Sequence, residues 1–185
     1  DAGVLFIAAA GNGRTDAPAY PASFDSVLSV AASDHQDKRA IFSNYGVTVD
    51  VAAPGGDILS TLPENRYGLA SGTSMAAPHV AGVAALVLSR FPNYSRQELF
   101  DILVNSVDPV LFDQPVGAGR LNAHLAVLMD QPLPIVRLAV PALLSGKTDI
   151  RGTALGSFFA GYQLRAGPGL YPTNWITLAV SGQPI

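Results

Sequence analysis

Ser74 is the residue whose setting most clearly indicates chemistry. It lies within residues 72–82 (Gly-Thr-Ser-Met-Ala-Ala-Pro-His-Val-Ala-Gly), where a glycine turn precedes a run of small apolar residues. That run predicts a helix, whose start supplies oriented N–H groups and a positive dipole end. A serine becomes a good nucleophile only when one group removes its proton and another stabilises the resulting oxyanion. Ser74 is therefore a candidate nucleophile, and Pro78 is expected in the first helical turn, where its missing N–H costs little.

A second feature lies upstream, where a short apolar run ends abruptly at Asn12. Residues 4–10 are all apolar and predict a buried parallel strand, which is followed by Gly11-Asn12-Gly13. An asparagine between two glycines is most often a turn residue that tolerates a left-handed backbone. Its carboxamide N–H₂ can also stabilise developing negative charge without changing its own charge. The residues alone leave both roles open.

Together the two features resemble the subtilisin-like serine proteases, the subtilases. Taken alone, a serine before an apolar run is most often a helix N-cap, but the full match over residues 72–82 favours the nucleophile. The resemblance implies an acyl-enzyme on Ser74, and an oxyanion held by Asn12 and the backbone N–H of Ser74. Loss of one such donor in a subtilisin lowers turnover by about 10²–10³, a magnitude that belongs to that enzyme.

The same resemblance continues to about Leu128 and implies which residues contact the substrate. The pocket for the side chain before the scissile bond would be lined by Ala9, Ala10, Gly11 and Ala19, and Thr73 would also bind substrate. These positions carry no charge, so a preference for apolar or aromatic side chains is expected. The implied partner is a protein or peptide substrate.

Some subtilases also hold a weakly bound cation, and the resemblance places Asp50 on that site. The carbonyl groups of Ala22, Phe24 and Val27 would complete a structural calcium or sodium site. One carboxylate makes a weak site for a hard cation, and an Asp50 that faces solvent is the alternative. No cofactor is required for the reaction.

The remaining members of a catalytic triad are missing from this sequence. In subtilisins the chain order is Asp, His and then Ser, so both partners are expected before Asn12. Asp1 is the only acidic residue there, and no histidine precedes Asn12. His79 is expected to be a packed, hydrogen-bonded helix histidine, and His35 and His124 are expected to face solvent.

These observations favour the C-terminal part of the catalytic domain of a longer serine endopeptidase. The N-terminal strands, the acid and the base would then lie outside these residues, and the chain alone would be inactive. The alternative is a non-catalytic fragment or pseudoprotease that acts as a binding or structural module.

Composition narrows the class of protein. The 185 residues are 49% hydrophobic and only 14% charged, as expected for a globular protein with a large core. A net charge of −3 gives no reason to expect nucleic acid or an anionic membrane surface as a partner. No apolar run is long enough to span a bilayer, and the absence of cysteine excludes disulfides and thiol catalysis. Family resemblance implies a secreted protein.

The expected fold class is α/β, with a mainly parallel sheet flanked by helices. We expect the catalytic part at 1–129, a linker at 130–134 and an incomplete β-rich module at 135–185. Ser95 and Glu98 predict a capping box at a helix start, and Asn122 predicts the N-cap of a last helix. Alternating residues at 158–165, and the segment 175–180, predict strands of the module, which loosely resembles β-rich modules appended to some bacterial subtilases.

Overall fold

The computed structural model describes residues 3–110, 112–130, 135–139, 151–155, 162–166 and 176–182. The chain divides into two compact units, Asp1–Gln131 and Pro132–Ile185. The boundary predicted at Met129 lies close to this division. The predicted linker is described only at Asp130, and its other residues lie outside the described part of the chain.

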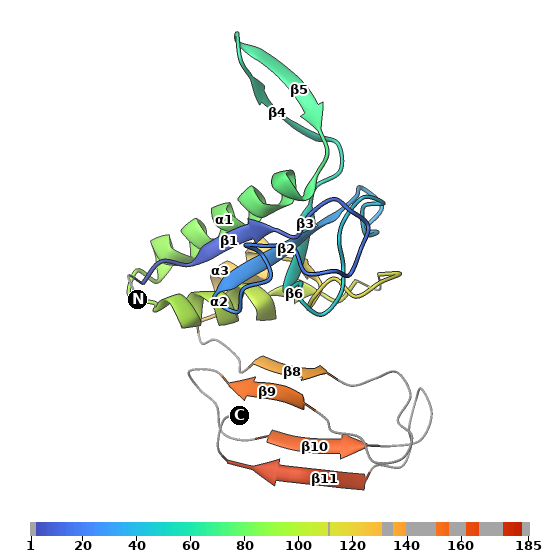
Figure 1. The fold of residues 1–185 in the computed structure, drawn as a ribbon. Helices are drawn as coiled ribbons and strands as arrows, with labels where there is room; N and C mark the ends of the chain where they lie inside the picture. Colours follow the sequence, from blue (N-terminus) through green and yellow to red (C-terminus); the bar gives the residue numbers. More distant parts are fainter. Residues whose placement is uncertain are drawn as a thin grey trace. The chain divides into compact units, whose positions relative to one another are not determined.

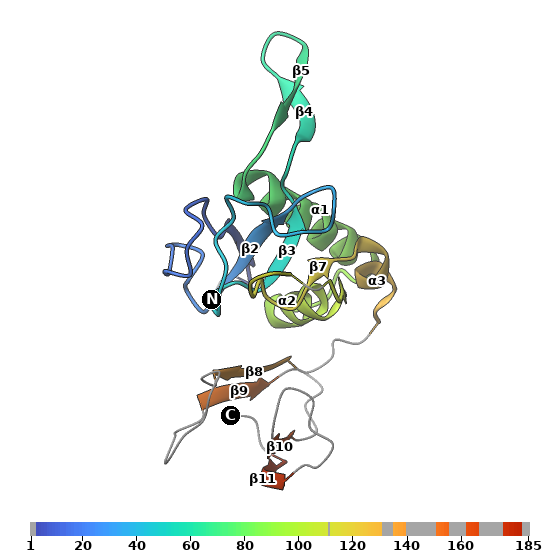
Figure 2. The same cartoon turned by 90° about the vertical axis from the view of Figure 1, so that its right-hand side faces the viewer.

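The first unit is built on a sheet of five strands in the order β1-β2-β3-β7-β6 (Figures 1 and 2). The strands are β1 (Phe6–Ala9), β2 (Val27–Ser33), β3 (Val51–Pro54), β6 (Val107–Asp108) and β7 (Arg120–Leu121). Neighbours from β1 to β7 are parallel, and β6 is antiparallel to β7. The predicted α/β class, with a mainly parallel sheet, is confirmed.

The middle of this sheet forms the core. Every residue of β2 is buried, as expected for a parallel strand that is covered on both faces. A buried cluster joins the sheet to the loops at its end, and Tyr45 and Phe112 pack against it; its members are Ala10, Ala31, Val49, Ala52 and Val116. The strand predicted at 4–10 is present as the shorter β1, but the prediction that it is buried is wrong: Phe6 is exposed, Ile7 to Ala9 are half-buried, and only Ala10, after its end, belongs to the core.

Three helices complete the first unit. Helix α1 (Thr73–Arg90) packs against β1, β2 and β3 and contacts α2 (Arg96–Asn105) and α3 (Ala123–Leu128). The capping box at the start of α2 is confirmed, because the Ser95 hydroxyl accepts from the Glu98 N–H and the Glu98 carboxylate accepts from the Ser95 N–H. Asn122 is the N-cap of α3 as predicted, its side chain accepting from the Leu125 N–H at 3.1 Å. No described helix has the length and apolarity needed to cross a membrane.

The position of Pro78 differs from the prediction. Since α1 begins at Thr73, Pro78 lies inside the helix, beyond its first turn. A proline there has no N–H for the carbonyl group four residues earlier, which belongs to Ser74. Separately, the N–H of Thr73 in the first turn is bonded from outside the helix, as described below.

A hairpin of β4 (Ile58–Leu62) and β5 (Arg66–Ala70) precedes α1 and projects from the body of the first unit (Figure 1). In the second unit, β8 (Ile135–Ala139) pairs with β9 (Arg151–Leu155), and β10 (Tyr162–Ala166) pairs with β11 (Ile176–Ser181). Both pairs are antiparallel. The strand predicted at 175–180 overlaps β11, and the described end of the strand predicted at 158–165 overlaps β10. The incomplete β-rich module expected at 135–185 stays a prediction.

Acidification is expected to weaken the start of α2. The Ser95 hydroxyl, and then the Ser95 backbone N–H, stabilise the Glu98 carboxylate and lower the pKa of that carboxyl below its usual value. A lowered folded-state pKa gives stability that is present above the unfolded pKa and is lost as the pH falls through the folded pKa. Urea unfolding of the native chain and of Glu98→Gln should therefore differ most at about pH 6 and least at about pH 3. A difference that stays constant over this range would contradict the assignment.

The edge strand β1 is expected to promote self-association. Among the described strands it pairs only with β2, and Val4 and Phe6 beside its open edge are 54% and 64% exposed. Unpaired N–H and C=O groups at an apolar edge are a template for another chain. Phe6→Lys should shift the chain toward monomer in sedimentation velocity, whereas Leu128→Lys on α3 should not. Equal self-association of both variants would exclude β1 as the edge through which the chains associate.

Candidate active site

Ser74 lies exposed on the first turn of α1, directly after a turn that is packed against the sheet. The backbone N–H of Gly72 in this turn donates to the carbonyl oxygen of Gly55, which follows β3, at 2.8 Å. A Cβ added to Gly55 would lie 2.6 Å from the Ala32 Cβ and 2.8 Å from the Gly72 oxygen. Only glycine at position 55 allows this close approach. The end of the sheet therefore fixes the position of the turn that precedes Ser74.

The Asn12 carboxamide hydrogen-bonds the start of α1. Its Oδ1 accepts from the Thr73 N–H at 2.9 Å and from the Thr73 hydroxyl at 3.0 Å. A backbone N–H can only donate, so Oδ1 must face Thr73 and Nδ2 must point elsewhere. Gly72, at the N-cap position, has no side chain that could bond the first helical N–H groups. Asn12 therefore caps α1 from a distant part of the chain.

The Asn12 carboxamide nitrogen, Nδ2, and the backbone nitrogen of Ser74 both lie close to Gly72. The position of a Cβ on Gly72 would lie 3.5 Å from Asn12 Nδ2 and 3.7 Å from the Ser74 backbone nitrogen. Asn12 and Ser74 are both exposed, whereas Gly72 is buried, and Met75 Sδ lies 3.7 Å from the same point. Two convergent N–H donors beside a hydroxyl can hold the oxygen of a carbonyl group that the hydroxyl attacks.

The residues implied in substrate binding lie in different surroundings. Gly11 and Ala19 are neighbours, since a Cβ on Gly11 would lie 3.6 Å from the Ala19 Cβ, and both are half-buried, as is Ala9. The methyl group of Ala10 belongs to the buried core cluster. The Thr73 side chain is fully buried, and its hydroxyl also accepts from the Gly11 N–H at 3.2 Å. Their roles in substrate binding stay predictions. Because the side chains of Ala10 and Thr73 are buried, these two residues would contact substrate through their backbone atoms.

None of the three histidines hydrogen-bonds Ser74 within the described part of the chain. The Nδ1–H of His79 donates to the Met75 carbonyl oxygen at 2.8 Å, so the predicted hydrogen bond is confirmed. His79 is exposed, however, and the prediction of a packed side chain is wrong. His35 and His124 are exposed, as predicted.

Asp50 is buried, so the alternative that it faces solvent is wrong. Its Oδ2 accepts from the Ser29 N–H at 2.7 Å, and the Phe24 carbonyl group, an implied cation ligand, accepts from the Val27 N–H at 2.9 Å. No group of three His, Cys, Asp or Glu side chains among the described residues is placed to hold a metal ion. A cation site at Asp50 with backbone carbonyl groups stays a prediction.

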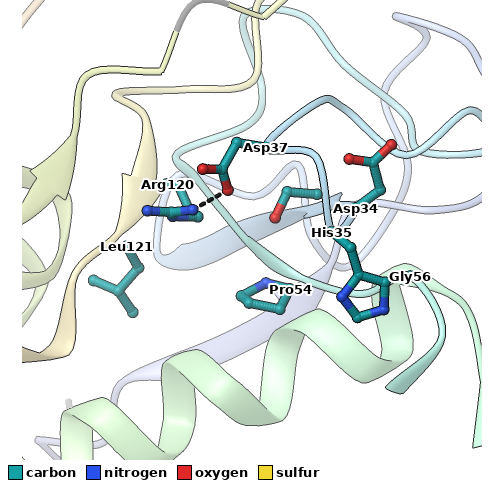
Figure 3. A pocket seen from close by; sticks show the side chains of 8 residues that line it. Asp34, His35, Asp37, Pro54, Gly56, Arg120 and Leu121 are labelled. Carbon is teal, nitrogen blue, oxygen red and sulfur yellow. Dashed lines mark hydrogen bonds and ion pairs between the residues drawn. The ribbon is translucent and has the colours of Figure 1, made fainter.

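A hollow of about 280 Å³ lies at the ends of β2, β3 and β7 (Figure 3). It is lined by Ser33, Asp34, His35, Asp37, Pro54, Gly56, Arg120 and Leu121. Arg120, its cationic group, already pairs with Asp37, as Figure 3 shows, and with Asp108 at 2.7 Å. Because neither Ser74 nor Asn12 lines this hollow, it is separate from the candidate active site.

Asn44 was not identified from the sequence as part of the site. This side chain is buried and its carboxamide bonds the loop that carries Asn12. Turn sequences are rich in asparagine for local reasons, so the type of residue alone carried no sign of this distant contact.

An exposed serine at a helix start, with the Asn12 carboxamide nitrogen nearby on a mainly parallel α/β scaffold, is an arrangement that suits a serine hydrolase. The model of the Subtilase family matches residues 1–123, and the chain belongs to this family.

Named relatives are proteases. The chain is 46% identical over 129 residues to the halolysin-like extracellular serine protease Nep of Natrialba magadii, covering 69% of this chain and 24% of the relative. It is 50% identical over 99 residues to a thermostable alkaline protease of Halalkalibacterium halodurans, covering 54% of this chain and 27% of the relative. With subtilisin BL of Lederbergia lenta, the identity is 40% over 124 residues, with 67% and 46% covered.

Solved structures show the same fold. A protease of Pseudoalteromonas arctica matches with a TM-score of 0.64 and 37% identity, over 68% of this chain and 42% of that one. The prenylagaramide maturation protease PagA matches with a TM-score of 0.61 and 36% identity, over 68% and 50%. The chain spans less than half the length of the curated relatives named above.

Gly55→Ala is expected to displace the turn before Ser74. The added methyl group would overlap Ala32 and the Gly72 carbonyl group, and overpacking of this kind costs about 1–3 kcal/mol of folding free energy. Urea unfolding measures this loss. Gly82→Ala is the matched control: nothing lies within 4 Å of its added Cβ, and alanine should stabilise α1 by about 0.5–1 kcal/mol. Equal stabilities of the two variants would show that the turn does not depend on the contact at Gly55.

Proposed function

We propose that residues 1–185 belong to a serine endopeptidase that cleaves peptide bonds through an acyl-enzyme on Ser74. The observation that supports this proposal is that Asn12 Nδ2 and the Ser74 backbone nitrogen lie 3.5 and 3.7 Å from one point, the position of a Cβ on Gly72. Membership of the subtilase family supports the same reaction.

The chemistry follows from these positions. A base takes the proton of Ser74 Oγ, which attacks the carbonyl carbon of the scissile bond. The oxyanion that forms accepts hydrogen bonds from Asn12 Nδ2 and the Ser74 N–H. Collapse of this intermediate breaks the C–N bond, and the amine leaves with the proton held by the base. Water then repeats the attack on the acyl-enzyme and restores Ser74.

The base and its orienting carboxylate come from a segment outside residues 1–185. His79 is the histidine nearest to Ser74 in sequence, yet its ring bonds the Met75 carbonyl group. The named relatives are more than twice as long as the matched part. We therefore expect residues 1–185 alone to be inactive.

The substrate would be a protein or peptide with an apolar or aromatic side chain before the scissile bond. Ala9, Gly11 and Ala19 carry no charge, and Gly11 and Ala19 lie side by side. The Natrialba magadii relative is named an extracellular protease, and we extend a secreted location to this protein. A structural calcium or sodium ion at Asp50 is part of the same proposal.

A fluorophosphonate probe tests the assignment of Ser74. In the complete protease, which would supply the base, the probe should label Ser74, as identified by peptide mass spectrometry, and labelling should be lost in Ser74→Ala. Residues 1–185 alone should react slowly or not at all. Ser71→Ala, on the exposed turn before α1, is the control and should be labelled normally.

Two results would count against this function. Equal labelling of Ser74→Ala and the native protein would place the nucleophile elsewhere. A complete protein that is folded but is never labelled would favour the alternative, a pseudoprotease that acts as a binding or structural module.

A further inference from the structure

Asn44 is a buried polar residue that lies against the loop containing Asn12. Its Nδ2 donates to the Ala10 carbonyl oxygen at 2.9 Å, and its Oδ1 accepts from the Gly13 N–H at 2.8 Å. The carboxamide therefore bonds the backbone on both sides of Asn12. Since a carbonyl oxygen can only accept and an N–H can only donate, these partners fix which end of the carboxamide is which.

Further contacts hold the same loop to the segment around Asn44. The Asn44 N–H donates to the Gly11 carbonyl oxygen at 2.9 Å, and the Thr15 N–H bonds Asn44 Oδ1 at 3.4 Å. Beside them, the Arg14 N–H donates to the Phe42 carbonyl oxygen at 3.1 Å. The backbone before and after Asn12 is thus bonded to a single partner segment.

Gly11 shows how closely Asn44 fits this loop. A Cβ on Gly11 would lie only 2.6 Å from Asn44 Nδ2. The φ of Gly11 is +105°, a backbone angle that residues other than glycine rarely adopt. On its other side, the Gly11 N–H donates to the Thr73 hydroxyl. The residue before Asn12 is therefore held between Asn44 and the start of α1.

We propose that Asn44 is a positioning residue for the oxyanion site, because its carboxamide fixes the backbone on both sides of Asn12 and so aims Asn12 Nδ2. The inference rests on the proposed function, in which Asn12 bonds the oxyanion. Asn44 acts through Asn12 and does not itself contact the substrate. Its loss should therefore affect the transition state more than the binding of substrate.

Asn44→Asp is the most informative variant, because it keeps the shape and the acceptor toward Gly13. It removes the donor to Ala10 and sets a carboxylate oxygen against that carbonyl group. In the complete protease, with a chromogenic peptide anilide that has an aromatic residue before the scissile bond, kcat should fall by about tenfold or more. KM should change by less than about twofold, because the interaction with the oxyanion is made only in the transition state.

A double-mutant cycle separates positioning from a general loss of structure. If Asn44 acts through Asn12, Asn44→Asp should leave kcat almost unchanged in a protein that already carries Asn12→Ala. A merely structural role predicts the same fractional loss of kcat in both backgrounds, and that result would overturn the inference.

Nuclear magnetic resonance on residues 1–185 tests the positioning without any catalysis. The side-chain N–H₂ signals of Asn12, identified by their loss in Asn12→Ala, should shift in Asn44→Asp. Asn122→Asp is the matched control, since it makes the same chemical change at the N-cap of α3 and should leave those signals in place. Unshifted Asn12 signals in Asn44→Asp would overturn the inference.

The kinetic results also distinguish the two proposals. If Asn12→Ala is slow but Asn44→Asp has native kcat, the inference about Asn44 fails and the proposed function stands. If Asn12→Ala itself has native kcat, the oxyanion role of Asn12 fails, and the role of Asn44 fails with it. Should Asn44→Asp not fold, as judged by circular dichroism, Asn44→Ser retains one polar group in the buried site and takes its place in every measurement.

Discussion

The geometry of the site depends on one hydrogen bond, from the Thr73 N–H to Asn12 Oδ1. It satisfies a helix N–H that has no partner inside α1, and it fixes the rotation of the Asn12 carboxamide at the same time. Since Oδ1 bonds the helix, Nδ2 points away from Thr73, and it lies near Gly72. The hydrogen bond that caps α1 thus also leaves Asn12 Nδ2 as the donor that the proposed chemistry requires.

This bond can form only because the surrounding chain approaches closely. Gly55 brings the exit of β3 against the Gly72 turn, where an added Cβ would overlap Ala32 and lie 3.2 Å from the Ala76 Cβ. Gly11 allows the equivalent approach of Asn44 on the other side of Asn12. Small residues at these contacts bring three segments that are distant in sequence to the ends of β1 and β3.

The elements of the first unit could be predicted because their signals are local. The apolar run before Asn12 gave its strand, and Ser95 with Glu98 gave the start of α2, since a capping box involves residues only three apart. Pro78 was misplaced by the same local reasoning. Proline is most favourable at the first helical position, whereas α1 begins five residues before Pro78, at Thr73, with its cap supplied by Asn12.

The candidate site could be predicted only in part, because its contacts join distant segments. Ser74 and Asn12 were predicted from their motifs. The structure places Asn12 Nδ2 and the Ser74 backbone nitrogen near Gly72, and their catalytic roles stay predictions. Asn44 was missed, since its partners from Ala10 to Thr15 are more than 25 residues away. The burial of Asp50 was missed for the same reason, because its carboxylate accepts a hydrogen bond from the backbone of a neighbouring strand.

The proposed reaction divides its work between two parts of the protease. The residues proposed as nucleophile and oxyanion donors, Ser74 and Asn12, lie at the start of α1 and in the loop after β1, held by contacts within residues 1–131. Stabilisation of charge by donors that are already in place requires no rearrangement when the charge forms. The base has a different task, since it must bind and release a proton in each cycle. The contacts that hold Asn12 and its loop are made within residues 10–73, so a base supplied by another segment need not alter them.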